Sequence, residues 1–441
     1  MIPLYSFIMG VFSMRNIFYL FLFTIPLFSS TLNQLTQYAL KHNTTIKQTA
    51  SQLELSTLKR QESRALQYGE LNVVGDYTHY NTERTLAPMT PSSMQSGQPI
   101  TTTKDLLSAG LRYTVPLFTG FAQTRQIEID DIASQMAASK MQLTKEQLVY
   151  NIRSLYLAVL SQKEILVAQK HYTTALMKLA KQITYEVTLG KRAQIDRLKA
   201  SADVEASRTQ QEMFKANIAT TKATLSALVG KSVGHLKRFK VTPKKPRYSV
   251  KRLYQKATHL AKVQMDEMAV KKAQKMILKS RASKLPQVNL NSYLGKNYGE
   301  DSHLNEWDNE TLWQVGVNVT YNLVDFGKRD IGVQKAKIAK MDALFKKEQT
   351  LLDLKKLITQ AVEQIKLSYA QYRGNLAQYK LGKKSEKIER VRYENDASTL
   401  NDLLLAKGKS QLAQAKLIES RYNYQKSRYY LDYIMERGVD K

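Results

Sequence analysis

Within a predicted strand at residues 311–324, positions 313–323 alternate strictly between apolar and polar residues. Every odd position from Trp313 to Leu323 is apolar, and the positions between them carry Gln, Gly, Asn or Thr. A period of two residues is typical of a β-strand with one apolar and one polar face. The alternating part is 11 residues long, a length that crosses a bilayer as a tilted strand. We therefore expect a membrane strand here.

Weaker stretches of the same alternation occur at residues 70–80, 106–117 and 287–298. They belong to an internal duplication. When the sequence is compared with itself at an offset of 206 residues, the stretch that begins at Tyr113 lies over the stretch that begins at Val319. Alternation and duplication together predict four membrane strands in each chain, two in each copy.

Each copy is expected to contain a helix, two strands and a long helical hairpin. The first copy is predicted at residues 31–230, with a hairpin turn near residue 190, and the second at residues 249–441, with a turn near residue 396. A basic linker, residues 231–248, is expected between them. In the first copy, a helix is predicted to run without a break up to the first strand.

The hairpins are predicted to be long coiled coils. There are 126 residues without proline before Pro243 and 155 after Pro286, and proline costs about 3 kcal/mol inside a helix. Apolar residues also step alternately by four and three positions: Ile358, Val362, Ile365, Tyr369, Tyr372, Leu376 and Tyr379. This heptad spacing predicts coiled-coil packing, so the expected fold is mainly α-helical with a membrane sheet.

Four strands are too few to close a barrel. An open sheet edge in lipid leaves backbone N–H and C=O groups unpaired, at a cost of about several kcal/mol each. The strands must therefore be pooled among several chains. Two chains would supply eight strands, which enclose a space filled by side chains, whereas three would supply twelve and leave a passage.

The N-terminus has the layout of an export signal. Arg15 precedes an apolar core from Ile17 to Phe28, and small residues follow. The core is too short for a membrane anchor, so we predict a Sec signal peptide at residues 1–30; translation could begin at Met1 or at Met14. The chain has no Cys, which excludes disulfides and a lipid anchor on Cys.

The net charge of +29 is concentrated in one region. Between Lys231 and Lys284 there are 17 Lys and Arg against two acidic residues. Such a run can bind nucleic acid or anionic lipid, or form a solvated surface. An export signal argues against nucleic acid as a partner.

No pattern of catalytic residues is present. The six His are scattered singly, and no metal-binding, nucleotide-binding or nucleophile motif occurs. We therefore predict that the chain is not an enzyme and has neither a cofactor nor a metal site.

The C-terminal passage and the duplicated layout resemble the TolC-like outer-membrane efflux protein family. The passage runs from Arg392-Tyr393 through Asn401–Ala406 to Ser420–Tyr424. The resemblance implies a homotrimer with one 12-stranded barrel in outer-membrane lipid and a long α-helical tunnel in the periplasm. It further implies that the basic linker lies in the equatorial region of that tunnel. It also implies a passive channel for efflux or type I secretion, which docks with a periplasmic adaptor and an inner-membrane RND or ABC transporter.

The family's gate residues can be placed where the motif matches. Helix-hairpin tips close the periplasmic entrance and open like an iris, and a Tyr on an inner helix is held by an Asp of a neighbouring hairpin. These residues fall on Tyr393 and Asp196. A family link from Arg to Thr falls on Ser398 and Ile195 and is absent here. Asp402 matches a ring of carboxylates at the constriction, which would attract cations.

Four residues at the turns are predicted to contact the adaptor: Gly190, Lys191, Arg192 and Asp396. A periplasmic coiled-coil structural or adaptor protein without a barrel is the alternative to a channel. Adaptors also contain helical hairpins, but we would expect one hairpin rather than two copies with membrane-length strands.

Overall fold

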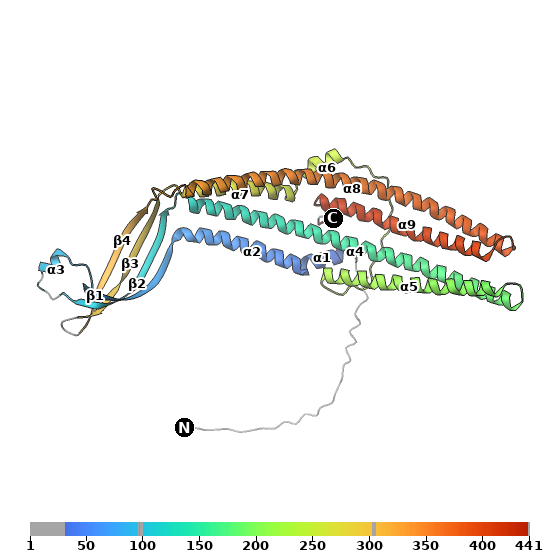
Figure 1. The fold of residues 1–441 in the computed structure, drawn as a ribbon, viewed down its shortest axis with the longest axis horizontal. Helices are drawn as coiled ribbons and strands as arrows, with labels where there is room; N and C mark the ends of the chain where they lie inside the picture. Colours follow the sequence, from blue (N-terminus) through green and yellow to red (C-terminus); the bar gives the residue numbers. More distant parts are fainter. Residues whose placement is uncertain (1–30, 96, 98–99, 302–305, 440–441) are drawn as a thin grey trace, which may run out of the picture.

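The computed structural model describes residues 31–95, 97, 100–301 and 306–439, so the predicted signal peptide lies outside the described residues. The molecule is elongated, with a sheet at one end and two helical hairpin turns at the other (Figure 1). Within the described ranges, no helix combines the length and apolar composition needed to span a bilayer.

The element order repeats. The first copy contains α1 (Leu32–His42), α2 (Thr44–Ala65), η1 (Leu66–Tyr68), β1 (Glu70–Thr85), α3 (Pro91–Gln95), β2 (Thr102–Phe118), α4 (Ala122–Thr188) and α5 (Gln194–Val229). The second contains α6 (Val250–Ala257), α7 (Ala261–Ala282), β3 (Gln287–Glu300), β4 (Trp307–Thr320), α8 (Lys328–Glu394) and α9 (Leu400–Ile434). This mainly helical, duplicated architecture with one antiparallel sheet confirms the predicted fold class of the chain.

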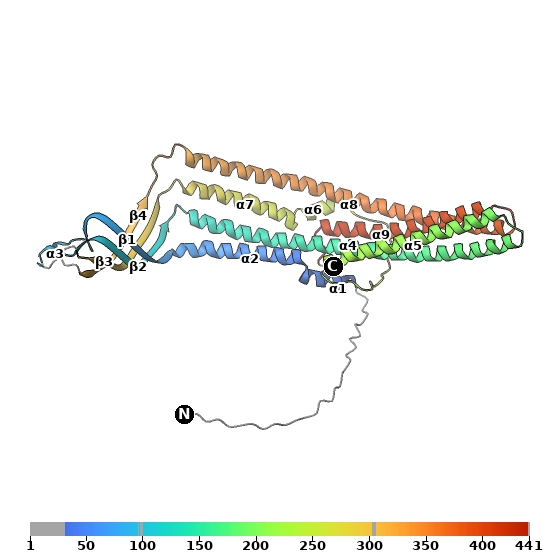
Figure 2. The same cartoon turned by 60° about the horizontal axis from the view of Figure 1, so that its bottom comes forward.

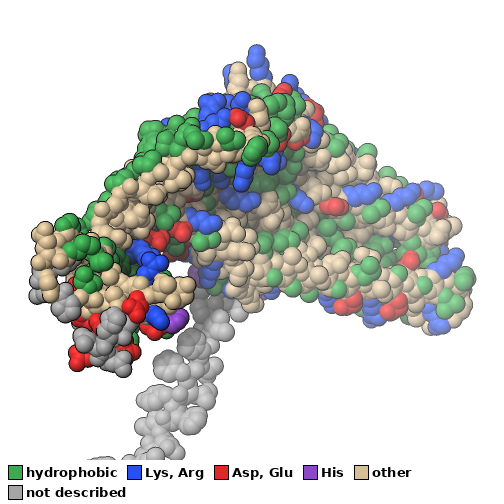
Figure 3. All heavy atoms as spheres, turned by 60° about the vertical axis from the view of Figure 1, so that its left-hand side comes forward, with side chains coloured by type: hydrophobic (Ala, Val, Ile, Leu, Met, Phe, Trp, Pro, Cys, Tyr) green, Lys and Arg blue, Asp and Glu red, His purple; other side chains and the backbone are tan. Residues whose placement is uncertain are grey.

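The strands pair antiparallel in the order β1–β2–β3–β4, so the pair β2–β3 joins the two copies. Side chains two residues apart share one face of a strand. The apolar set of β4 is therefore presented together, and Trp313, Val315, Val317 and Val319 are 60–72% exposed. Hydrophobic side chains gather on the surface at this end of the molecule (Figure 3).

The fourth strand begins and ends four residues earlier than the predicted range 311–324. The carboxylate of Asp325 accepts hydrogen bonds from the backbone N–H groups of Gly327 (3.2 Å) and Arg329 (2.9 Å). These bonds turn the chain into α8, so β4 ends at Thr320. In the sequence, apolar and polar residues go on alternating after Thr320, the last residue of β4 that pairs with β3. The alternation therefore could not show where the strand ends.

The helices form a long layer that continues from the sheet (Figure 2). Near the sheet they pack in the order α2, α4, α7 and α8, and near the turns in the order α5, α4, α9 and α8. The helices α4 and α8 have 67 residues each, or about 100 Å at the helical rise. Since α2 leads into β1 and β4 leads into α8, the helical layer and the sheet share their two edges.

Short helices continue longer ones through polar side chains. The predicted first helix is broken at Asn43, whose side-chain oxygen accepts from the N–H groups of Thr45 (2.9 Å) and Ile46 (3.3 Å) at the start of α2. The Asn43 amide also donates to the Leu228 carbonyl (2.8 Å) at the end of α5. Asn43 therefore caps one helix and joins it to another.

The second copy makes the same junction with a different residue. The carboxylate of Glu436, just after α9, accepts hydrogen bonds from the N–H groups of Ala261 (2.7 Å) and Lys262 (3.1 Å) at the start of α7. Burial raises the pKa of Glu436 above its usual value, and these two hydrogen bonds oppose that shift.

We expect Asn43→Ala to destabilise the fold by about 1–2 kcal/mol, because it removes an N-cap and leaves the Leu228 carbonyl unpaired. Thermal unfolding followed by far-UV circular dichroism in detergent measures the effect. Asn217→Ala on the exposed face of α5 is the matched control and should change stability by less than about 0.5 kcal/mol. Equal melting temperatures for Asn43→Ala and the unmodified chain would show that this junction contributes nothing.

Candidate functional site

The two hairpin turns lie side by side at the end of the molecule opposite the sheet (Figure 1). The first turn separates α4 from α5, and the second separates α8 from α9. Both use left-handed backbone, at Gly190 (φ 70°) and at Asp396 (φ 56°). Glycine adopts this conformation freely and Asp tolerates it better than most residues, which explains why these residue types stand at the turns.

Arg192 connects the two turns. Its guanidinium donates to a carboxylate oxygen of Asp396 (2.8 Å) in the second turn and to Glu186 (3.2 Å) in its own hairpin. The guanidinium carbon also lies 4.6 Å from the ring centroid of Tyr393, within the range of a cation–π contact. The sequence predicted Arg192 and Asp396 as separate contacts for an adaptor, whereas the structure pairs them with each other.

Tyr393 is buried between the hairpins, with 3% of its surface exposed. Its ring belongs to an apolar cluster drawn from both hairpins: Leu179, Ile183, Ala200, Leu400 and Leu403. Burial raises the pKa of the hydroxyl; Arg192 opposes the shift, and the charges of Glu186, Asp196 and Asp396 add to it. The cluster is the apolar core that holds the two tips together.

The predicted bond between Tyr393 and Asp196 is not formed within this chain. The Tyr393 hydroxyl is buried and has no hydrogen-bond partner among the described residues. Asp196 lies in the first turn of α5 and acts on Tyr393 through its charge. A buried hydroxyl without a partner is costly, so the bond to an Asp of a neighbouring hairpin stays a prediction for the assembled protein.

Asp402 has a structural role in the single chain. With Thr399 it forms a capping box at the start of α9, in which each side chain accepts a hydrogen bond from the other residue's N–H (both 3.2 Å). Hydrogen bonds from Thr399 hold the pKa of Asp402 below its usual value. The predicted carboxylate ring would oppose this shift, because like charges disfavour ionisation.

The remaining turn residues are solvent-facing. Gly190 and Lys191 are exposed, and Lys191 makes no ion pair with any described residue. Ile195, one of the two positions of the absent Arg–Thr link that the resemblance implies, is 53% exposed. Glu186 was missed by sequence reasoning, because it precedes Arg192 by six residues across a turn and no periodicity connects them. In the described part of the chain, no cluster of three His, Asp or Glu could hold a metal ion.

The chain matches the family model described as "Outer membrane efflux protein" over residues 35–231 and 254–435. A crystal structure of a membrane protein from Pseudomonas aeruginosa is similar, with a TM-score of 0.78, 17% identity and 92% of each chain covered. The CmeC outer membrane channel of Campylobacter jejuni has a TM-score of 0.77 and 17% identity, over 92% of this chain and 86% of that one.

The open state of the MtrE outer membrane channel of Neisseria gonorrhoeae is also similar, with a TM-score of 0.74 and 15% identity over 92% of this chain and 89% of that one. No match was found among curated proteins. At these identities the structural likeness shows the shared fold, and the family match covers both copies of the duplicated unit.

We expect Arg192→Gln to raise hydrogen–deuterium exchange in both turns by about two- to fivefold, because partly exposed ion pairs contribute about 0.5–1 kcal/mol. Asp396→Asn, which keeps a residue that tolerates left-handed backbone, should have a smaller effect. The double variant should exchange no faster than Arg192→Gln alone. Lys191→Gln removes one exposed charge at the same turn and is the control; an equal effect of Lys191→Gln would contradict the pairing.

Proposed function

Because the chain belongs to the outer membrane efflux protein family, we propose that three copies form a passive channel across the outer membrane. In this proposal the pooled strands close a 12-stranded barrel, and the pooled hairpins continue it as a tunnel in the periplasm. A periplasmic adaptor and an inner-membrane transporter of the RND or ABC type supply cargo and energy, for efflux or for type I secretion.

One observation carries the proposal: the sheet and the helical layer are open at the same two edges. The sheet ends at β1 and β4, and the adjoining helices end at α2 and α8. A neighbour that pairs its β4 with β1 therefore brings its α8 against α2. Such a head-to-tail contact repeats around an axis and closes into a ring when the rotation fits.

The edge helices have apolar residues available for this contact. On α8 an exposed seam repeats every seven residues at 56–60% exposure: Ile331, Ile338, Phe345 and Leu352. On α2, Leu55 and Leu58 are 54% and 53% exposed. Heptad seams pack against a second helix in coiled coils, so this seam supports an α8–α2 contact between neighbouring copies.

The sheet supports the same assembly. Its exposed apolar face suits lipid, and its unpaired edges do not, because each unpaired backbone group in lipid costs about several kcal/mol. Three chains supply enough strands to leave a passage, whereas two would fill the interior. A coiled-coil adaptor without a barrel gives no reason for four long strands with an exposed apolar face.

The turns would close the periplasmic end of the tunnel. Arg192 ties the two hairpins of one chain together through Asp396, in place of the family's missing link at Ser398 and Ile195. Tyr393 offers a buried hydroxyl for Asp196 of a neighbouring hairpin, and three Asp402 carboxylates would form a cation-attracting ring. Opening then requires the tips to separate like an iris, with Gly190 and Lys191 at the surface that meets the adaptor.

We expect Ile338→Glu to dissociate the trimer, because it places a charge in an apolar contact between copies. Lys337→Glu reverses the charge of an exposed neighbour on α8 and should leave the trimer intact. Cross-linking and light scattering of detergent-extracted protein measure the stoichiometry. An unmodified chain that is a stable monomer and gives no conductance in a planar bilayer would rule out the channel.

We expect Arg192→Gln to increase single-channel conductance at least about twofold, because weakening the tie between hairpins favours the open tips. Asp402→Asn should lower the preference for cations, which reversal potentials in a salt gradient measure. Lys191→Gln is the control and should conduct like the unmodified channel. Equal conductance of Arg192→Gln and Lys191→Gln would contradict the role of Arg192 in closure.

A further inference from the structure

A belt of unpaired positive charge crosses the middle of the molecule. We define the basic belt as residues 31–43 and 230–260, which contain no acidic residue. All of its Lys and Arg side chains are exposed: Lys41, Lys231, Lys237, Arg238, Lys240, Lys244, Lys245, Arg247, Lys251, Arg252 and Lys256. None of these forms an ion pair with another described residue.

This sets the belt apart from the rest of the surface. Elsewhere many cations are paired, for example Lys275 with Glu128 (3.0 Å), Lys347 with Glu267 (2.9 Å) and Lys366 with Glu363 (2.7 Å). A merely Lys-rich surface would show the same mixture of paired and free cations in the belt. The belt's cations instead form no ion pair with any described residue, and this points to a negatively charged partner.

The belt is held in place although most of it is neither helix nor strand. Val233, Leu236 and Val241 are 1–7% exposed and anchor it in the core between its basic residues. The Tyr156 hydroxyl of α4 donates to the Lys237 carbonyl (2.5 Å), and the Tyr424 hydroxyl of α9 donates to the Lys244 carbonyl (2.6 Å). Burial raises the pKa of Tyr156 to about 12, so its hydroxyl remains a donor.

These contacts place the belt across one face of the helical layer. The chain between α5 and α6 runs over α4 and then over α9, and α1 and α6 lie at its two ends (Figure 1). Lys237 and Lys244 are anchored through their backbone carbonyls, which leaves their side chains exposed. The Nζ of Lys231 lies 3.9 Å from the centroid of the Tyr38 ring, within the belt itself. The result is a fixed array of cations and not a mobile tail.

The belt is too far from the sheet to act on membrane lipid. The helices α2 and α7, of 22 residues each, separate it from β1 and β3, which is about 33 Å at the helical rise. The Debye length at physiological ionic strength is about 8 Å. If the sheet spans the outer membrane, lipid headgroups are screened from the belt, and its partner lies in the periplasm.

The composition of the belt favours a charged polymer over a protein. Protein interfaces are enriched in aromatic residues, Met and Arg at their core and depleted in Lys. Eight of the eleven cations are Lys, and Tyr248, at 36%, is the belt's only exposed large hydrophobic side chain. Lys offers a hydrated point charge on a flexible stem, which suits repeated, salt-sensitive contacts with an irregular polyanion.

We propose that the basic belt binds the peptide carboxylates of the cell-wall peptidoglycan and so fixes the channel in that layer. The inference rests on the proposed function, because it needs the sheet in the outer membrane. Each contact is a Lys or Arg with a carboxylate, and binding depends on the number of charges and on salt.

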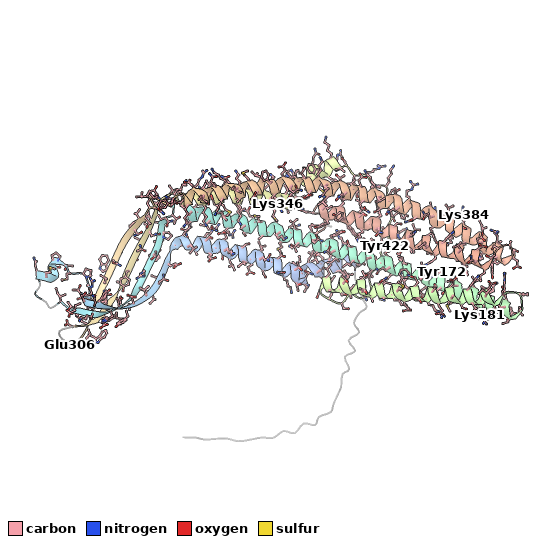
Figure 4. The ribbon with its side chains drawn as sticks, in the orientation of Figure 1. Tyr172, Lys181, Glu306, Lys346, Lys384 and Tyr422 are labelled. Carbon is pink, nitrogen blue, oxygen red and sulfur yellow. The ribbon has the colours of Figure 1, made fainter. Side chains whose placement is uncertain are left out.

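The test is co-sedimentation of the full chain, extracted in detergent from outer membranes, with purified insoluble sacculi. The belt variant carries Lys237→Gln, Arg238→Gln, Lys240→Gln and Lys244→Gln, which spare the anchoring carbonyls. The control variant removes four exposed, unpaired cations of α8: Lys380, Lys383, Lys384 and Lys387, each replaced by Gln. Lys384 is labelled in Figure 4, far from the belt.

We expect the belt variant to bind sacculi at least about tenfold more weakly, since each cation near an anionic surface contributes about 1 kcal/mol before screening. The control variant should bind within about twofold of the unmodified chain. High salt, or amidation of the sacculus carboxylates, should abolish binding. Equal losses in the two variants, binding to amidated sacculi, or capture by anionic vesicles or an acidic adaptor instead of sacculi would overturn the proposal.

Conductance of the same samples separates this proposal from the preceding one. A chain that binds sacculi through the belt but does not conduct contradicts the channel and supports the belt. A chain that conducts as a trimer but does not bind sacculi contradicts the belt and supports the channel. The belt variant should conduct like the unmodified protein, because its substitutions lie outside the turns.

Discussion

The pairing of backbone hydrogen bonds at the edges of the sheet is the constraint on which the rest depends. In lipid, N–H and C=O groups have no water to bind, so the free edges of β1 and β4 require partner strands. Each edge strand continues directly into an edge helix, so in the proposed assembly a neighbouring copy that pairs with the edge strand also places α8 beside α2. One rotation between copies would therefore pair the edge strands and pack the edge helices at the same time. The exposed apolar residues of α8 have the seven-residue spacing that such helix packing requires.

Duplication explains how one chain builds so long a layer from helices of unequal length. In each copy a shorter helix, α2 or α7, continues a longer one, α5 or α9. At each junction a polar side chain accepts hydrogen bonds from the free N–H groups at the start of the shorter helix. Asn43 does so as a neutral amide and Glu436 as a carboxylate, which also suits the positive end of a helix dipole. Similar geometry is thus reached by different chemistry.

The middle of the helical layer is held more firmly than the end that carries the turns. The belt is anchored by buried aliphatic side chains and two tyrosine hydroxyls, whereas the turns are joined by a small cluster around Tyr393 and one arginine. Regions with few buried contacts open at the lowest free energy. The turns are therefore the part best suited to move, while the middle keeps its charges in a fixed arrangement.

The sequence alone determined the features that have a local period: alternating strands, heptad helices, the duplication, and the positions of the turns at Gly190 and near Asp396. These follow from the geometry of the backbone, which repeats every two or 3.6 residues. It did not determine where β4 ends, or that Asn43 divides a helix, because single side-chain hydrogen bonds decide both. Only the tertiary structure paired Arg192 with Asp396. It also showed that, among the described residues, the Tyr393 hydroxyl has no hydrogen-bond partner and the belt's cations have no acidic partner. Contacts such as that between Arg192 and Asp396 join residues that are far apart in the sequence. A pattern that repeats every two or 3.6 residues carries no information about them.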